Sequence, residues 1–150
     1  MGLNEKVVIV LNERIEAGRL LNAAAHLALG YGASRGDSGQ TELHLLNYVD
    51  ASGEPHPNIS ALSLIVLKAT PGQLRALWQR AYSEGIARMS FTDTMTEGSY
   101  DEQLDRTRST PSDQLIYIGV LLFGTRERLD PLTRKFSLFR AFAAPGNGAL

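Results

Sequence analysis

Three polar side chains interrupt an otherwise small and apolar stretch, residues 18–30 (GRLLNAAAHLALG). Arg19, Asn22 and His26 are three and four residues apart, so on a helix they lie within about 60° of one another. An imidazole can act as a general base, and a nearby guanidinium can hold an anion or stabilise developing negative charge. The pattern favours either a polar pocket beside a buried helix or three side chains with hydrogen-bond partners in the core.

A second group of candidates follows a predicted strand at 86–91 (IARMSF). Asp93 comes just after that strand, at the kind of position where clefts open in α/β sheets. A basic run at 126–140 could converge on an anion such as phosphate. We therefore predict a catalytic group made of His26, Asp93 and Arg19. The predicted substrate-binding residues are Asn22, Thr94, Thr96 and Lys135.

Several kinds of site are disfavoured by residue type and spacing. The chain has no cysteine, and its histidines (His26, His44 and His56) do not form HxH or HExxH spacing, so we expect no metal or cofactor. The segment Asp50–Gly53 resembles the first half of a calcium loop but lacks the later acidic ligands, so it predicts a turn. His56 lies between two prolines, either on the surface or over a cleft.

The bulk composition indicates a soluble globular protein of 150 residues, with 43% hydrophobic residues, 21% charged residues and a net charge of −1. A net charge close to zero lacks the excess of positive charge that is typical of nucleic-acid-binding proteins. Nucleic acid could bind only through a local basic patch, which we do not favour. The apolar run at 7–11 (VVIVL) is too short for a signal peptide or a membrane span. We therefore expect a cytoplasmic protein with no membrane partner.

The elements that must position these residues alternate between strands and helices. Continuous apolar strands are predicted at 7–11, 62–69 and 115–123, and such strands need cover on both faces. Helices are predicted at 18–29, ended by Gly30, at 72–84, opened by Pro71, and at 124–132. No regular pattern is found at residues 34–40 or 92–105. A hairpin or edge excursion is predicted at residues 43–58, and apolar and polar residues alternate again at 134–139.

These elements predict an α/β fold class, a three-layer α-β-α domain with a mixed sheet of four or five strands, at residues 1–142. Residues 143–150 are predicted to form a flexible tail. Because the helix at 18–29 is apolar nearly all round, it is predicted to be buried on most sides.

The segment KVVIVLNERIEAGRLLNAAAHLALGYG resembles the opening of the type II peptidyl-tRNA hydrolases. Aligned on the histidine of that family's helix, Gly18 and His26 match, whereas Arg19 replaces a lysine and Ala23 replaces a glutamine. The second strand and helix, the acid at Asp93 and the closing segment IYIGVLLFGTRERLDPLTRKFSLF are also similar to the family. This resemblance covers most of residues 6–140, with an insertion around 37–60. It implies the type II peptidyl-tRNA hydrolase fold and a homodimer.

The family's acidic residue is followed by Ala-Gly-Arg-Thr, whereas here Asp93 is followed by Thr-Met-Thr-Glu. The phrases LNAAAHLALGYG, YVDASGEPHPNIS, FTDTM and LTRKFSLFR are similar to a bacterial group of unknown function with the same fold. Two hypotheses result. The protein is a non-catalytic or divergent binder of an unknown small molecule or of a peptide or ester ligand. Alternatively, it is a metal-free hydrolase of an ester or amide bond.

Overall fold

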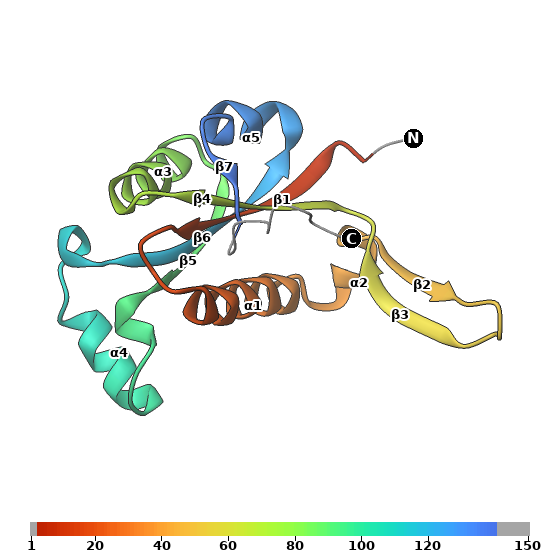
Figure 1. The fold of residues 1–150 in the computed structure, drawn as a ribbon, viewed down its shortest axis with the longest axis horizontal. Helices are drawn as coiled ribbons and strands as arrows, with labels where there is room; N and C mark the ends of the chain where they lie inside the picture. Colours follow the sequence, from red (N-terminus) through yellow and green to blue (C-terminus); the bar gives the residue numbers. More distant parts are fainter. Residues whose placement is uncertain (1–2, 141–150) are drawn as a thin grey trace, which may run out of the picture.

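A five-stranded mixed sheet forms the centre of the computed structural model, which describes residues 3–140 (Figure 1). The strand order is β5-β6-β1-β4-β7. β1 pairs in parallel with β4 and antiparallel with β6, while β5 and β7 pair antiparallel with β6 and β4 at the two edges. The strands are β1 (Glu5–Asn12), β4 (Ser63–Ala69), β5 (Ala87–Thr92), β6 (Tyr117–Thr125) and β7 (Ser137–Leu138). The predicted mixed sheet is confirmed, with five strands.

Helices cover both faces of this sheet (Figure 1). Helix α1 (Ala17–Ser34) lies on one face, and α3 (Pro71–Ser83) and α5 (Arg126–Thr133) lie on the other. The central strand β1 contributes side chains to the cores on both faces of the sheet, because successive side chains of a strand point to opposite faces. Val7, Ile9 and Leu11 pack with the core under α1, and Val8 and Val10 pack with the core under α3 and α5.

Helix α1 differs from its prediction in length and in burial. It does not end at Gly30 but continues to Ser34, and a side chain at Gly30 would meet the methyl group of Met89 at 3.0 Å. That glycine therefore permits close packing against β5 instead of ending the helix. The predicted burial on most sides is wrong, since Leu21 and Leu29 are 65% and 72% exposed. Nothing within residues 3–140 covers the outer face of the helix.

The remaining predicted helices and the hairpin are confirmed with small shifts in their ends. Thr70 and Gln73 form a capping box at the start of α3, and Gly85 after that helix has a φ of +66°. Strands β2 (Leu45–Val49) and β3 (Pro55–Ser60) form a two-stranded ribbon that projects from the body (Figure 1). The expected loop at 34–40 instead contains the end of α1, a short 3-10 turn η1 (Gly36–Ser38) and the start of the short helix α2 (Gly39–Glu42).

Helix α4 (Tyr100–Arg108) was not predicted from the sequence and stands away from the sheet (Figure 1). Ser99 and Glu102 form a capping box at its start, a signal that is visible in the sequence. Two single turns flank α4, η2 (Asp93–Met95) and η3 (Ser112–Gln114). Over residues 3–140, no helix is long and apolar enough to cross a bilayer. The predicted tail at 143–150 lies outside the described residues.

Candidate functional site

The three polar residues of α1 lie on the surface. Arg19, Asn22 and His26 are all exposed, and the backbone N–H of Arg19 donates to Oε1 of the helix-capping Glu16 at 2.9 Å. The His26 ring stacks on Phe91 of β5, with 5.3 Å between the ring centroids and 17° between the planes. The three side chains therefore do not form a polar seam inside the core, and His26 is held against the edge strand β5.

The polar groups after β5 are engaged in hydrogen bonds that shape the backbone. Oδ1 of Asp93 accepts from the backbone N–H of Ile116 at 3.1 Å. The buried Thr94 hydroxyl lies 2.7 Å from the Thr92 hydroxyl and 2.8 Å from that of Thr107 on α4. Thr96 donates its hydroxyl to the carbonyl of Asp93 at 2.8 Å. The Asp93 and Thr94 bonds join η2 to the residue that precedes β6 and to α4, and the Thr96 bond closes the turn, so each of the three predicted site residues has a structural role.

The predicted site residues are only partly brought together. His26 stacks on Phe91, two residues before Asp93, so both belong to the region around the end of β5. Within residues 3–140, no hydrogen bond or ion pair links Asp93 to a predicted residue on α1. Lys135 precedes β7 at the opposite edge of the sheet, with its Nζ 5.5 Å from the centre of the Phe136 ring. The catalytic and substrate-binding assignments remain predictions.

A pocket of about 280 Å³ lies between the second half of α1 and the strands β3 and β4. Most of its surface is apolar, with Leu62 and Leu64 on the sheet side and Ala28 and Gly32 on the helix side. Asn58 and Ser60 of β3 add polar groups at the rim, and Asn58 has a φ of +64°. We call this cavity the Tyr31 pocket, because Tyr31 also lines it.

The Tyr31 hydroxyl is the unusual group of this pocket. The residue is only 5% exposed, and its hydroxyl has no hydrogen-bond partner within residues 3–140. Its ring packs against Phe123 at 5.2 Å and beneath the guanidinium of Arg35 at 4.7 Å. Burial raises the pKa of Tyr31 to about 12, so the phenol keeps its proton at neutral pH. A buried hydroxyl without a partner costs about 1–3 kcal/mol.

Tyr31 is not among the predicted site residues, because the sequence predicts that the helix ends at Gly30. The periodicity of the buried residues Leu20, Ala23, Leu27 and Tyr31 extends through that glycine and was the available signal. The missing hydrogen-bond partner could not be read from this pattern, since it depends on the side chains that the sheet and the hairpin place around the phenol.

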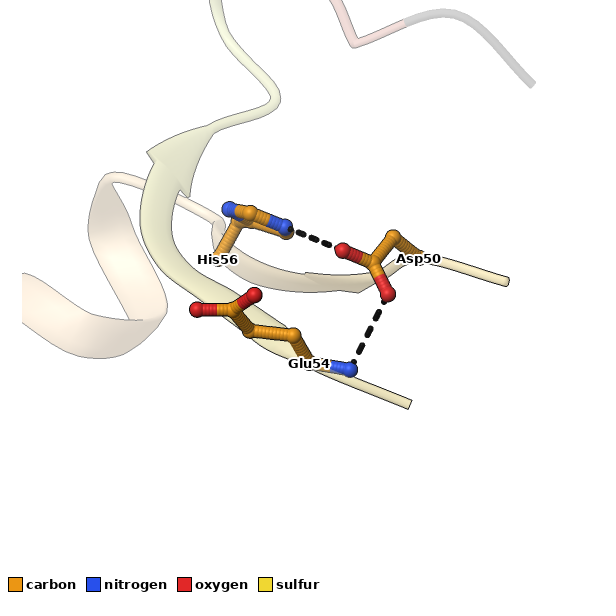
Figure 2. Close-up of side chains that lie close together, drawn as sticks. All are labelled: Asp50, Glu54 and His56. Atoms are coloured by element: carbon orange, nitrogen blue, oxygen red, sulfur yellow. Dashed lines mark hydrogen bonds and ion pairs between the residues drawn. The ribbon is translucent and has the colours of Figure 1, made fainter. Parts of the chain in front are cut away.

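The tip of the β2–β3 hairpin brings together Asp50, Glu54 and His56, with one ligand atom of each lying within 4.8 Å of the others (Figure 2). The Asp50 carboxylate accepts from the backbone N–H groups of Ser52 and Glu54, and its other oxygen lies 3.1 Å from Nε2 of His56. The His56 hydrogen bond, followed by the two backbone bonds, lowers the pKa of Asp50. All three side chains are exposed. The trio could ligate a cation, but the same contacts close the predicted turn, and His56 is a surface residue.

Comparison with known proteins identifies the family. The family model described as "Protein of unknown function (DUF2000)" matches residues 5–140. The chain belongs to this family. A solved structure of a protein of unknown function from Agrobacterium tumefaciens strain C58 is similar, with a TM-score of 0.76 and 20% identity. The match covers 92% of this chain and 99% of the other. No curated protein matches the chain.

These matches establish the family and the fold but assign no activity. The DUF2000 model and the Agrobacterium protein both carry descriptions of unknown function. The likeness to type II peptidyl-tRNA hydrolases, and with it the homodimer, therefore stays a prediction from the sequence.

Proposed function

We propose that this DUF2000 protein is a non-catalytic, ligand-binding member of its family and that its ligand is a small, largely apolar molecule. The observation that carries this proposal is the buried Tyr31 hydroxyl, which has no hydrogen-bond partner within residues 3–140 and belongs to a residue that lines the cavity. Buried polar groups normally have hydrogen-bond partners. A ligand with one oxygen acceptor would supply the missing partner.

The shape and polarity of the Tyr31 pocket define the ligand class. Its volume of about 280 Å³ suits a molecule smaller than most drugs. Contact with Leu62, Leu64 and Ala28 would remove the apolar body of the ligand from water, which stabilises a complex by roughly 25 cal/mol per Å². The neutral phenol of Tyr31 would donate a hydrogen bond to a carbonyl or ether oxygen, and this single bond would fix the orientation of the ligand.

Two probes of matched shape test the proposal: cyclohexanone, which has an acceptor oxygen, and methylenecyclohexane, which has none. We expect both to cause saturable shifts of the amide NMR signals of Ala28, Gly32 and Leu64. Tyr31→Phe should weaken cyclohexanone binding about fivefold to tenfold relative to the wild-type protein. That variant should leave methylenecyclohexane binding unchanged, because only the hydroxyl is lost.

Two further variants serve as controls for the binding experiment. Tyr117→Phe also removes a hydroxyl from a buried tyrosine, but in the core on the other face of the sheet, and should leave both affinities unchanged. Ala28→Trp places a large side chain in the pocket wall and should abolish binding of both probes. The absence of saturable shifts with either probe would refute the proposal. Equal cyclohexanone affinity in wild-type and Tyr31→Phe protein would show that the hydroxyl is not the recognition group.

A metal-free ester or amide hydrolase is the second candidate. It is supported by the stacking of His26 on Phe91, two residues before Asp93, which keeps a candidate base near a strand end. The engagement of Asp93 and Thr94 in backbone and hydroxyl contacts argues against it. Turnover of peptidyl-tRNA or a nitrophenyl ester that disappears in folded His26→Ala protein would support this candidate, and the absence of turnover by wild-type protein would remove it.

The homodimer implied by the sequence resemblance is also a proposal. Leu21 and Leu29 lie exposed on the outer face of α1, where a second copy could cover them. Sedimentation equilibrium should give a dimer mass for the wild-type protein and a monomer mass for a Leu21→Asp, Leu29→Asp variant. A wild-type monomer at micromolar concentration would contradict the dimer.

A further inference from the structure

A second pocket, of about 330 Å³, lies on the other face of the sheet, beside α3, β5 and η3. Aromatic rings and two arginines dominate its wall, which consists of Arg75, Trp78, Gln79, Tyr82, Arg88, Ser112, Asp113 and Tyr117. We call it the arginine pocket. It is separate from the Tyr31 pocket, because Tyr117 belongs to the core under α3 and α5 and Tyr31 to the core under α1.

Arg88 is held in a fixed position in this pocket. Its Nη1 donates to the carbonyl of Trp78 at 2.8 Å, and its Cζ lies 3.6 Å from the centre of the Trp78 ring and 4.7 Å from that of Tyr82. Cation–π contacts of this kind favour a cation over the ring face. The guanidinium has five N–H donors in a planar fork, so the single carbonyl bond leaves most of them open to another acceptor.

Arg75 presents a second guanidinium with similar unused capacity. Its Nη2 donates to the carbonyl of Leu115 at 2.9 Å, and the side chain is half-buried. Within residues 3–140, neither Arg75 nor Arg88 forms an ion pair, whereas Arg80 on the same helix pairs with Glu84 at 3.2 Å. One carboxylate, that of the exposed Asp113, also lines the pocket. The wall therefore carries two positive charges and one negative charge.

We propose that the arginine pocket binds a small organic anion, a carboxylate or a phosphate ester, through the guanidiniums of Arg75 and Arg88. Hydrogen bonds between ionised partners are about twice as strong as neutral ones, and the guanidinium fork matches the oxygens of both anions. The rings of Tyr82 and Tyr117 supply apolar surface for the body of the ligand. The face of Trp78 next to Arg88 is already covered by that guanidinium, so the ligand does not stack there.

Trp78 reports on this pocket directly because it is the only tryptophan of the chain. Its fluorescence should change saturably when phenyl phosphate or benzoate is added at low ionic strength. Benzyl alcohol, which has the ring without the charge, should give no saturable change. The tighter of the two anions identifies the phosphate or the carboxylate as the preferred group, and added salt should weaken both.

Arg75→Gln should weaken binding of the preferred anion about tenfold or more, because it removes one charged partner without touching the Trp78 environment set by Arg88. Arg80→Gln, on the same helix, is the matched control and should leave the affinity unchanged. If Arg75→Gln protein does not fold, amide NMR shifts of the wild-type protein replace it, and they should concentrate in α3, β5 and η3. No saturable change with either anion up to on the order of 10 mM would overturn the proposal. Equal weakening by Arg75→Gln and Arg80→Gln, or shifts concentrated elsewhere, would also overturn it.

Discussion

The end of β5 and the Tyr31 pocket both place hydroxyl groups in buried positions near α1, but the two regions use them differently. At the end of β5, the hydroxyl of Thr94 contacts those of Thr92 and Thr107, and Asp93 accepts from Ile116. In the Tyr31 pocket, the phenol has no partner within residues 3–140. A polar group with satisfied bonds stabilises its loop, whereas a buried group without a partner carries a cost that our proposal assigns to a ligand to relieve. The candidates with the most suggestive residue types are therefore not the ones most available for binding.

The largest predicted effect tests whether the hydroxyls after β5 are structural. Thr94→Val keeps the shape of the side chain but removes the hydroxyl that contacts both Thr92 and Thr107. Thr107 keeps its bond to the Gln103 carbonyl, whereas the buried Thr92 hydroxyl loses its partner, so the free energy of unfolding should fall by about 2 kcal/mol. Urea denaturation would measure this loss. Thr96→Val is the control, since its half-buried hydroxyl makes one bond to a carbonyl and should cost less. A smaller loss for Thr94→Val than for Thr96→Val would remove the contrast between the two regions.

The next effect concerns the titration of Tyr31. Its pKa is about 12 in the folded protein and about 10 in the unfolded chain, so the folded state keeps the proton to higher pH. The stability from the neutral phenol is complete below pH 10 and is lost as the pH rises from 10 towards 12. Relative to Tyr31→Phe, the wild-type protein should lose about 1 kcal/mol between pH 9 and pH 11. A difference between the two proteins that stays constant over this range would contradict the burial of the phenol.

The smallest effect extends the comparison to the exposed tip of the hairpin. The hydrogen bond from His56 is the main cause of the low pKa of Asp50, so His56→Ala should raise that pKa towards its ordinary value. Carboxyl carbon NMR shifts, followed as the pH is lowered, would measure the change. Glu54→Gln is the matched control, because it keeps the backbone N–H that donates to Asp50. Removing the Glu54 charge can only lower the Asp50 pKa, so a fall in Glu54→Gln as large as the rise in His56→Ala would mean that general charge, rather than the His56 contact, sets the Asp50 pKa.

Much of the fold could be predicted from local sequence signals. The apolar run of β1 indicated a strand covered on both faces, and Pro71 marked the start of α3. The end of α1 could not be predicted, because Gly30 serves close packing with Met89 on β5, a contact between distant segments. Helix α4 could have been found from the Ser99 and Glu102 capping box, although its acidic composition suggested a loop.

The candidate site was harder to predict, because a polar side chain is free to bind a ligand only if residues from other helices and strands do not already bond to it. The sequence placed His26 and Asp93 in one predicted group, and the structure stacks His26 on Phe91, two residues before Asp93. The sequence could not show that Asp93 accepts a hydrogen bond from Ile116, 23 residues away. Arg75 and Arg88 illustrate the same point, since they come from α3 and β5 and line one pocket only after the chain folds. Residue types indicate which chemistry is possible, and the contacts of the folded chain determine which groups remain free for it.

The free energy of unfolding of Tyr31→Phe at pH 7 tests the central claim most directly, because it compares the free proteins without any ligand. If the Tyr31 hydroxyl is unpaired, its removal relieves a buried polar group, and the variant should be as stable as the wild-type protein or about 1 kcal/mol more stable. If the variant instead loses about 1 kcal/mol or more, as expected for Thr94→Val, the hydroxyl has a partner in the free protein. That result would contradict the proposal that the hydroxyl is available to a ligand.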